Sequence, residues 1–258
     1  MNIKIKKILK KKNKSKIVCL TAYSKNFAEE VDKYADITLV GDSLGSVLYN
    51  YNSTKKVTLT NMIDHSRSVR LGVKKSLMVV DMPYKSYDTS NLALKNAKKI
   101  IKETKCDAVK LEGGKKILKQ VKLLIKNKIP VMGHLGLLPQ SVKGKFKSKG
   151  KTIREVNKLI NEALLLQQSG VFSIVLECVK TSVAKRVTQK LNIPTIGIGS
   201  SVYCDGQVLV TDDLLGLNQT KIKFVKKFIN IKKYINFGVR KFTSEVRSRK
   251  YPTKKYSY

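Results

Sequence analysis

The stretch Ala108–Glu112, with the sequence AVKLE, is a short apolar run that carries two charged side chains and ends on one of them. Successive side chains of a strand point to opposite faces, so Lys110 and Glu112 share a face. Continuous apolar runs are typical of strands in a parallel sheet, because helices cover both faces of such a sheet. The stretch therefore predicts a buried strand with a polar ending.

Seven other apolar runs resemble this one, and at least five of the eight end at or near a polar residue of catalytic type. The eight runs are Val18–Tyr23, Ile37–Asp42, Leu77–Asp81, Ala108–Glu112, Pro130–His134, Phe172–Glu177, Pro194–Gly199 and Gln207–Asp212. Polar groups at the ends of parallel strands converge on one face, which in an eight-stranded barrel holds the active site. A doubly wound open sheet is the structural alternative, but eight repeats with polar endings favour a (βα)8 TIM barrel.

Segments with apolar residues at helical spacing lie between these runs. They are Lys25–Tyr34, Asn61–Leu71, Asn91–Thr104, Lys115–Lys126, Ile153–Gln168, Ser182–Leu191 and Phe224–Ile229. Strands and helices that alternate with short connectors predict right-handed βαβ units. The chain shows no internal repeat and no linker rich in Pro or Ser, so we expect one domain over residues 1–258, with basic peripheral segments at about 1–16 and 240–258.

The formal net charge of +35 over 258 residues suggests a nucleic-acid-associated protein as the non-enzyme alternative. However, 46 of the 53 basic residues are lysines, and they are scattered over every predicted helix and loop. Proteins that read nucleic acids rely on arginine, whose planar group pairs with bases and phosphates in two places at once. We therefore expect no specific nucleic-acid partner, and such a partner would leave the carboxylates at the strand ends unexplained.

The cysteines and the lengths of the apolar stretches indicate the cellular compartment in which the protein is expected to work. The chain has four cysteines, Cys19, Cys106, Cys178 and Cys204, which form no CxxC pair and lie mostly in or beside apolar runs. This pattern is typical of buried free thiols in a reducing compartment. No apolar stretch is long enough for a transmembrane helix or for the core of a signal peptide. We expect a cytoplasmic enzyme with no membrane partner.

Four acidic residues, Asp42, Asp81, Glu112 and Glu177, end predicted strands in a chain with only 18 acids. Carboxylates that face one another repel unless a cation lies between them. An all-oxygen set of ligands suits a hard cation, most simply Mg²⁺. The structural alternative is that each acid caps the helix that follows it.

Lys110, placed on the enclosed inner face, is costly there unless it is paired or binds an anion. We interpret it as an anchor for a substrate carboxylate or enolate, with a structural pair to Glu112 as the alternative. His134 ends the fifth run and points to the same mouth, where it either donates to substrate or has a structural role. His65 lies in a helical segment, and the Gly-rich piece Gly197–Ser201 is a weak indication of a ligand.

A set of short motifs runs along the chain. The motifs are Val40–Gly45 (VGDSLG), Asp81–Pro83 (DMP), Lys110–Gly114 (KLEGG), Gly133–Leu137 (GHLGL) with Pro139–Ser141 (PQS), Leu176–Cys178 (LEC), and Gly197–Gly199 (GIG) with Asp205–Gln207 (DGQ). Taken together in their order and spacing, they resemble the ketopantoate hydroxymethyltransferase family. The resemblance extends from about Val18 to the C-terminus. Each motif is modest alone, but the ordered set is specific.

The resemblance implies a barrel of the phosphoenolpyruvate/pyruvate type and a Mg²⁺-dependent transferase of pantothenate biosynthesis. Its reaction moves a one-carbon unit from 5,10-methylenetetrahydrofolate to 3-methyl-2-oxobutanoate and yields 2-dehydropantoate. The resemblance also implies a large homo-oligomer, often a decamer.

The resemblance also implies roles for particular residues. Asp42 and Asp81 match the carboxylates that hold the metal and, through it, the substrate, and Glu112 completes the set directly or through water. Ser43 and Lys110 match groups that bind the oxo acid, and Glu177 matches the proposed proton acceptor.

The chain departs from the family pattern in the loop Ser141–Lys151, which is about two residues shorter than usual. The enzyme alternative is another Mg²⁺-dependent enzyme that forms an enolate of a 2-oxo acid, such as a carbon–carbon lyase. Those relatives often carry a catalytic cysteine in a mobile loop, and the loop Ser141–Lys151 has none.

Overall fold

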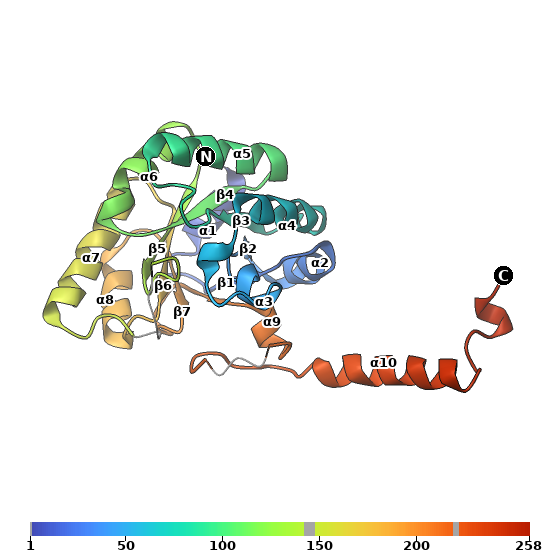
Figure 1. Ribbon diagram of the computed structural model, residues 1–258. Helices are drawn as coiled ribbons and strands as arrows, with labels where there is room; N and C mark the ends of the chain where they lie inside the picture. Colours follow the sequence, from blue (N-terminus) through green and yellow to red (C-terminus); the bar gives the residue numbers. More distant parts are fainter. Residues whose placement is uncertain (1, 142–147, 219–221) are drawn as a thin grey trace. The chain divides into compact units, whose positions relative to one another are not determined.

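The computed structural model describes residues 2–141, 148–218 and 222–258, and the chain divides into two compact units, Met1–Val210 and Thr211–Tyr258 (Figure 1). The first unit is a closed barrel of eight parallel strands in sequence order, so the predicted (βα)8 fold is confirmed. The strands are β1 Ile17–Thr21, β2 Ile37–Val40, β3 Leu77–Asp81, β4 Ala108–Glu112, β5 Val131–Gly136, β6 Ser173–Glu177, β7 Thr195–Ile198 and β8 Gly206–Leu209. The predicted single domain over residues 1–258 stays a prediction.

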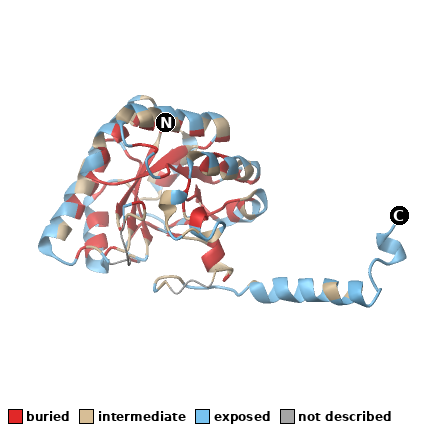
Figure 2. Ribbon diagram, in the orientation of Figure 1, coloured by how far each residue is buried: buried red, intermediate tan, exposed pale blue. Residues whose placement is uncertain are grey.

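Helices surround the strands of the first unit, and their buried faces turn inward (Figure 2). They are α1 Ile3–Lys10, α2 Lys25–Tyr34, the short α3 Leu44–Val47, α4 Leu59–Gly72, α5 Ser90–Thr104, α6 Leu118–Lys126, α7 Ile153–Gln168 and α8 Thr181–Lys190, with single 3₁₀ turns η1 Thr54–Lys56 and η2 Lys115–Ile117. Threonines define several helix starts, because the side chains of Thr58, Thr89 and Thr152 each accept a backbone N–H three residues on. In the described part of the chain, no helix has the length and apolar character to cross a membrane.

Residues 1–16 do not form the peripheral segment that their lysines suggested. Ile5 and Ile8 of α1 are 1% and 3% exposed, and they pack with the first residues of β1, β2 and β3. Lys12 forms an ion pair of 2.9 Å with the buried Asp205. The helix therefore covers the amino end of the barrel with two apolar anchors. Lys4 donates to the carbonyl oxygen of Ser76 over 2.8 Å, while the other lysines of the helix are exposed.

The second unit contains α9 Thr211–Leu214, α10 Lys232–Arg247 and a 3₁₀ turn, η3 Lys254–Tyr256. The predicted helix Phe224–Ile229 is wrong. The backbone N–H of Phe228 donates to Leu214 O and that of Ile231 donates to Leu215 O, so these amides bond to the end of α9 instead of to the preceding turn. The helix begins only at Lys232 and has no buried residue. The peripheral segment expected at 240–258 stays a prediction.

A buried aspartate joins α2 to the turn before β3. The carboxylate of Asp32 accepts the backbone N–H groups of Lys74, Lys75 and Ser76 and the hydroxyl of Ser76, over 2.7–3.0 Å. Burial by itself raises the pKa of Asp32, but these hydrogen bonds outweigh it and lower the pKa below its usual value. The turn that leads into β3 is thus held by one charged acceptor.

We expect Asp32→Asn to lower the free energy of unfolding by about 2 kcal/mol, because hydrogen bonds to a charged group are worth roughly 1.5–3 kcal/mol. A lowered folded-state pKa gives stability that is present above the unfolded-state pKa and is lost as pH falls through the folded-state pKa. Urea unfolding should therefore show a large difference between the two proteins at pH 7 and a shrinking one below pH ~4. Asp64→Asn, at an exposed ion pair with Arg67, is the control; equal losses in both variants would contradict the role of Asp32.

Candidate active site

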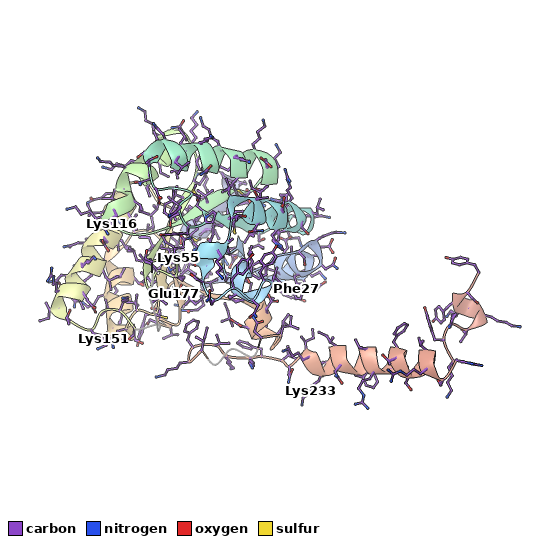
Figure 3. The ribbon with its side chains drawn as sticks, viewed as in Figure 1. Phe27, Lys55, Lys116, Lys151, Glu177 and Lys233 are labelled. Carbon is purple, nitrogen blue, oxygen red and sulfur yellow. The ribbon has the colours of Figure 1, made fainter. Side chains whose placement is uncertain are left out.

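Five strands bring their predicted site residues to one end of the barrel. The pairing register places Asp81 beside Lys110, and Glu112 beside His134, on neighbouring strands. Asp42 follows β2 by two residues, and Glu177, marked in Figure 3, ends β6. All of them are buried except Glu177, which is partly exposed. The carboxyl ends of the strands therefore assemble the charged cluster that the sequence predicted.

Lys110 is the cation at the centre of this cluster. Its Nζ lies 3.0 Å from Asp81 Oδ1 and 3.3 Å from His134 Nδ1, and the residue is only 5% exposed. Burial alone lowers the pKa of Lys110, but the carboxylates of Asp81, Glu112 and Asp42 outweigh burial and raise it above its usual value. These contacts thus favour the charged form of Lys110 at the inner end of the site. A pair of Lys110 with Glu112 alone does not describe its surroundings, since its ion-pair contact is with Asp81.

His134 lies between two carboxylates. Its Nδ1 is 3.5 Å from Glu112 Oε1, and its Nε2 is 3.2 Å from Glu177 Oε2. Burial and the charge of Lys110 lower the pKa of His134, but its contacts with Glu112 and Glu177 outweigh them and raise it to about 9. The imidazole is therefore placed to orient Glu177, the side chain predicted to act as a base.

Gln140 and Tyr87 belong to the site, although the sequence reasoning assigned neither of them a role. Gln140 Nε2 donates to Asp42 Oδ2 over 2.8 Å and to the carbonyl oxygen of Met82 over 3.0 Å, while its backbone N–H donates to Glu112 Oε2 over 3.1 Å. The hydroxyl of Tyr87 donates to Gln140 Oε1. Gln140 lies in the motif Pro139–Ser141, which is the only feature of the sequence that pointed to it. No motif of the sequence pointed to Tyr87.

Ser43 lies at the end of the loop that carries Asp42, and its hydroxyl is 2.8 Å from the hydroxyl of Tyr23. The backbone N–H of Asp42 donates to Asp81 Oδ2 over 3.1 Å, which ties the loop after β2 to β3. His65 lies outside the cluster: its Nδ1 is 2.7 Å from the carbonyl oxygen of Tyr23, and its Nε2 is 2.8 Å from the hydroxyl of Tyr49.

The acids of the cluster can be compared with the needs of a divalent cation. Burial raises the pKa of Asp42 well above its usual value, and the charges of Asp81 and Glu112 add to this; burial also raises the pKa of Asp81. Two buried carboxylates that resist ionisation side by side are the arrangement that a cation stabilises.

The donor set is small, since over the described residues no three His, Cys, Asp or Glu side chains are spaced to hold a metal. Both oxygens of Glu112 are already engaged, by His134 and by the N–H of Gln140. Two carboxylates with substrate and water are sufficient for Mg²⁺. The chemistry of Asp42 and Asp81 therefore suits this metal, and the role expected for Glu112 stays a prediction.

The cysteines and the loop Ser141–Lys151 are the remaining features that the sequence singled out. Cys19, Cys106 and Cys204 are buried, Cys178 is half-buried, and all four thiols are free. Burial raises the pKa of the Cys106 thiol to about 11. Of the loop Ser141–Lys151, residues 142–147 lie outside the described residues.

Comparison with solved structures identifies the class of barrel. Phosphonopyruvate hydrolase matches with a TM-score of 0.64 and 7% identity, covering 95% of this chain and 87% of that chain. A 2,3-dimethylmalate lyase of the PEP mutase/isocitrate lyase superfamily matches with a TM-score of 0.60 and 10% identity, covering 96% and 99% of the two chains. The first unit is thus a TIM barrel of the kind found in that superfamily, and at this identity the likeness concerns the fold alone.

Sequence comparison identifies the family. The model of the ketopantoate hydroxymethyltransferase family matches residues 2–254. A 3-methyl-2-oxobutanoate hydroxymethyltransferase of Pelagibacter ubique is 63% identical over 258 residues and all of both chains, and one of Rhizobium etli is 46% identical over 94% of this chain and 90% of its own. The chain belongs to the ketopantoate hydroxymethyltransferase family and is a hydroxymethyltransferase.

Proposed function

We propose that the protein transfers a hydroxymethyl group from 5,10-methylenetetrahydrofolate to 3-methyl-2-oxobutanoate, giving 2-dehydropantoate for pantothenate biosynthesis. The names of relatives that are 63% and 46% identical support the acceptor. The observation that carries the chemistry is the buried group of Asp42, Asp81 and Lys110, two acids and one cation that meet at the carboxyl ends of β2, β3 and β4. The carboxylate and keto oxygens of a 2-oxo acid can pair with the Lys110 ammonium group and with a cation that the two acids hold.

Binding of the oxo acid falls to the inner part of the cluster. Asp42 and Asp81 would hold Mg²⁺, which when bound supplies a Lewis acid for the oxygens of a 2-oxo acid. Lys110, fixed by Asp81 at 3.0 Å, places a positive charge beside the carboxylate or enolate oxygen of the substrate. The Ser43 hydroxyl, which Tyr23 positions at 2.8 Å, contributes a hydrogen bond. Gln140 holds Asp42 and Glu112 in place through its side-chain and backbone N–H groups.

Proton removal falls to Glu177. Its side chain is partly exposed at the end of β6, so an incoming substrate can reach it, and His134 orients it through a contact of 3.2 Å. Glu177 takes the proton from C3 of the oxo acid, and the electron pair of that C–H bond becomes the nucleophile. Water releases the methylene carbon of the folate from both nitrogens as formaldehyde, and the two protons of the water pass to those nitrogens. The C3 carbanion adds to the formaldehyde carbon, and the resulting alkoxide takes up the proton that Glu177 removed, which completes the hydroxymethyl group.

The reaction can be tested by incubating the protein with Mg²⁺, 3-methyl-2-oxobutanoate and 5,10-methylenetetrahydrofolate and detecting products by mass spectrometry. We expect 2-dehydropantoate, formed only when all three are present. Cleavage of an oxo acid without folate would instead support a carbon–carbon lyase and would refute the proposed reaction.

We also propose that the chain assembles with copies of itself. Helix α10 supports this assembly, because one face carries Ile235, Val239 and Phe242, which are 51%, 60% and 56% exposed. Contiguous apolar side chains on a surface mark an interaction site. The decamer and the cytoplasmic location stay predictions.

Ile235→Glu is expected to reduce the size of the assembly, because a charge on the apolar face cannot be desolvated in an interface. Lys233→Glu is the matched control, since Lys233 lies two positions away and therefore on the opposite side of the helix (Figure 3). Light scattering after size-exclusion chromatography measures both masses. A wild-type mass of one chain, or equal masses for wild type and Ile235→Glu, would contradict the role of this face.

A further inference from the structure

Two loops run outward from the candidate site to exposed aromatic residues. The loop after β2 leaves Asp42 and passes through α3 to Tyr49 and Tyr51. The loop after β3 leaves Asp81 and reaches Tyr84 three residues later, a span of at most about 11 Å of extended chain. The same loops that position the two acids therefore carry these tyrosines at the rim of the site.

Lysines from both loops converge on one of the rings. Lys55 Nζ lies 5.4 Å from the centre of the Tyr84 ring, and Lys85 Nζ lies 5.8 Å from it. Lys56 Nζ lies 5.8 Å from the centre of the Tyr51 ring. The contact between Lys55 and Tyr84 joins the two loops. Two ammonium groups beside one ring repel each other, and an anion bound between them would relieve this repulsion.

The aromatic residues, more than the lysines, distinguish this surface, because lysines cover the whole chain. Leu48, Tyr49 and Tyr84 are 46%, 40% and 38% exposed, which is a large apolar area for two short loops. The rings of Tyr49 and Tyr51 stack with their centres 5.4 Å apart. The Tyr49 hydroxyl is 2.8 Å from His65 Nε2, which holds the ring in place. The result is a fixed and partly open stacking surface.

The backbone of both loops is held in a conformation that non-glycine residues rarely adopt. Asn50 has a φ of 53° and Lys85 has a φ of 63°, and each directly follows an exposed tyrosine. Backbone of this kind costs free energy and clusters where side chains must be aimed at a ligand. Acids are scarce here: residues 43–61 contain none, and Asp88 is the single acid at 82–90.

We propose that this tyrosine–lysine platform, formed by Tyr49, Tyr51, Tyr84, Lys55 and Lys85, binds the tail of the one-carbon donor. The inference rests on the proposed function, which requires a folate. The aminobenzoyl ring of a folate stacks on the tyrosines, and its glutamate carboxylates pair with the lysines. The methylene group, which bridges the pterin to the nitrogen on the aminobenzoyl ring, then faces the cluster around Asp42 and Asp81.

The test measures binding by titration calorimetry with two probes, tetrahydrofolate and tetrahydropteroate, which lacks the glutamate. In the double variant Lys55→Gln/Lys85→Gln, we expect the Kd for tetrahydrofolate to rise roughly tenfold, as loss of two partly exposed ion pairs allows. The Kd for tetrahydropteroate should not change. Lys98→Gln/Lys99→Gln, which removes two exposed lysines from the outer face of α5, is the charge-matched control and should bind both probes like the wild type.

Tyr84→Leu keeps an apolar side chain but removes the ring, and it should weaken the binding of both probes. Equal affinities of wild type and Lys55→Gln/Lys85→Gln for tetrahydrofolate would overturn the proposal, as would an equal loss for both probes. Loss of binding to a single-stranded oligonucleotide in that variant, with tetrahydrofolate unaffected, would assign the platform to nucleic acid instead. The proposed reaction is judged separately by proton exchange of the oxo acid, which needs no folate.

Discussion

Asp81→Ala is expected to slow the metal-dependent exchange of the C3 proton of 3-methyl-2-oxobutanoate by about a thousandfold or more. The change removes one of two carboxylates that fit Mg²⁺ and leaves Lys110 without its nearest anion. A metal stabilises the charge of the transition state by several kcal/mol, and each ~1.4 kcal/mol of this stabilisation that is lost slows the reaction tenfold. The measurement is proton exchange by NMR, together with Mg²⁺ titration by calorimetry.

A second variant keeps this prediction testable if the first folds poorly. Removing one partner of a buried ion pair costs about 3–5 kcal/mol of stability. Asp81→Asn preserves the shape of the side chain and an acceptor for the N–H of Asp42, and it should retain the fold while losing the metal. Unchanged Mg²⁺ affinity in a folded Asp81 variant would refute the assignment of this residue as a ligand.

Glu177→Gln is expected to bind 3-methyl-2-oxobutanoate and Mg²⁺ like the wild type but to exchange the C3 proton about a hundredfold to ten thousandfold more slowly, the usual contribution of a positioned general base. The amide retains the size of the side chain but cannot accept a proton. Binding by calorimetry and exchange by NMR separate the two effects.

The matched comparison for Glu177→Gln is Glu162→Gln, a change on α7 outside the cluster of strand-end residues. It should exchange the proton at the wild-type rate. A wild-type rate in Glu177→Gln would show that another group removes the proton, and a loss of substrate binding would show that Glu177 serves binding instead.

Most of the barrel was predictable because each strand is a short apolar run with a turn after it. The strands Leu77–Asp81 and Ala108–Glu112 and the helices Lys25–Tyr34 and Ile153–Gln168 have the predicted bounds. The polar endings predicted the convergence of the acids as well, since the geometry of a parallel barrel follows from strand order alone.

Other parts depend on contacts between distant residues. Lysines separate Ile5 from Ile8, so the sequence did not indicate that α1 has an apolar face. That face is identified by its packing against the barrel. Gln140 acts through three hydrogen bonds to different loops and strands, which no local pattern specifies. The residues 224–229 have helical spacing, but their amides bond to α9 instead.

The most direct test of the central claim is the loss of the C3 proton of 3-methyl-2-oxobutanoate in D₂O, followed by NMR with and without Mg²⁺ and then with 5,10-methylenetetrahydrofolate. If the strand-end cluster removes this proton as proposed, exchange will require Mg²⁺, and addition of the folate will convert the oxo acid to 2-dehydropantoate. Absence of exchange in folded, Mg²⁺-loaded protein would contradict the proposed chemistry of the site.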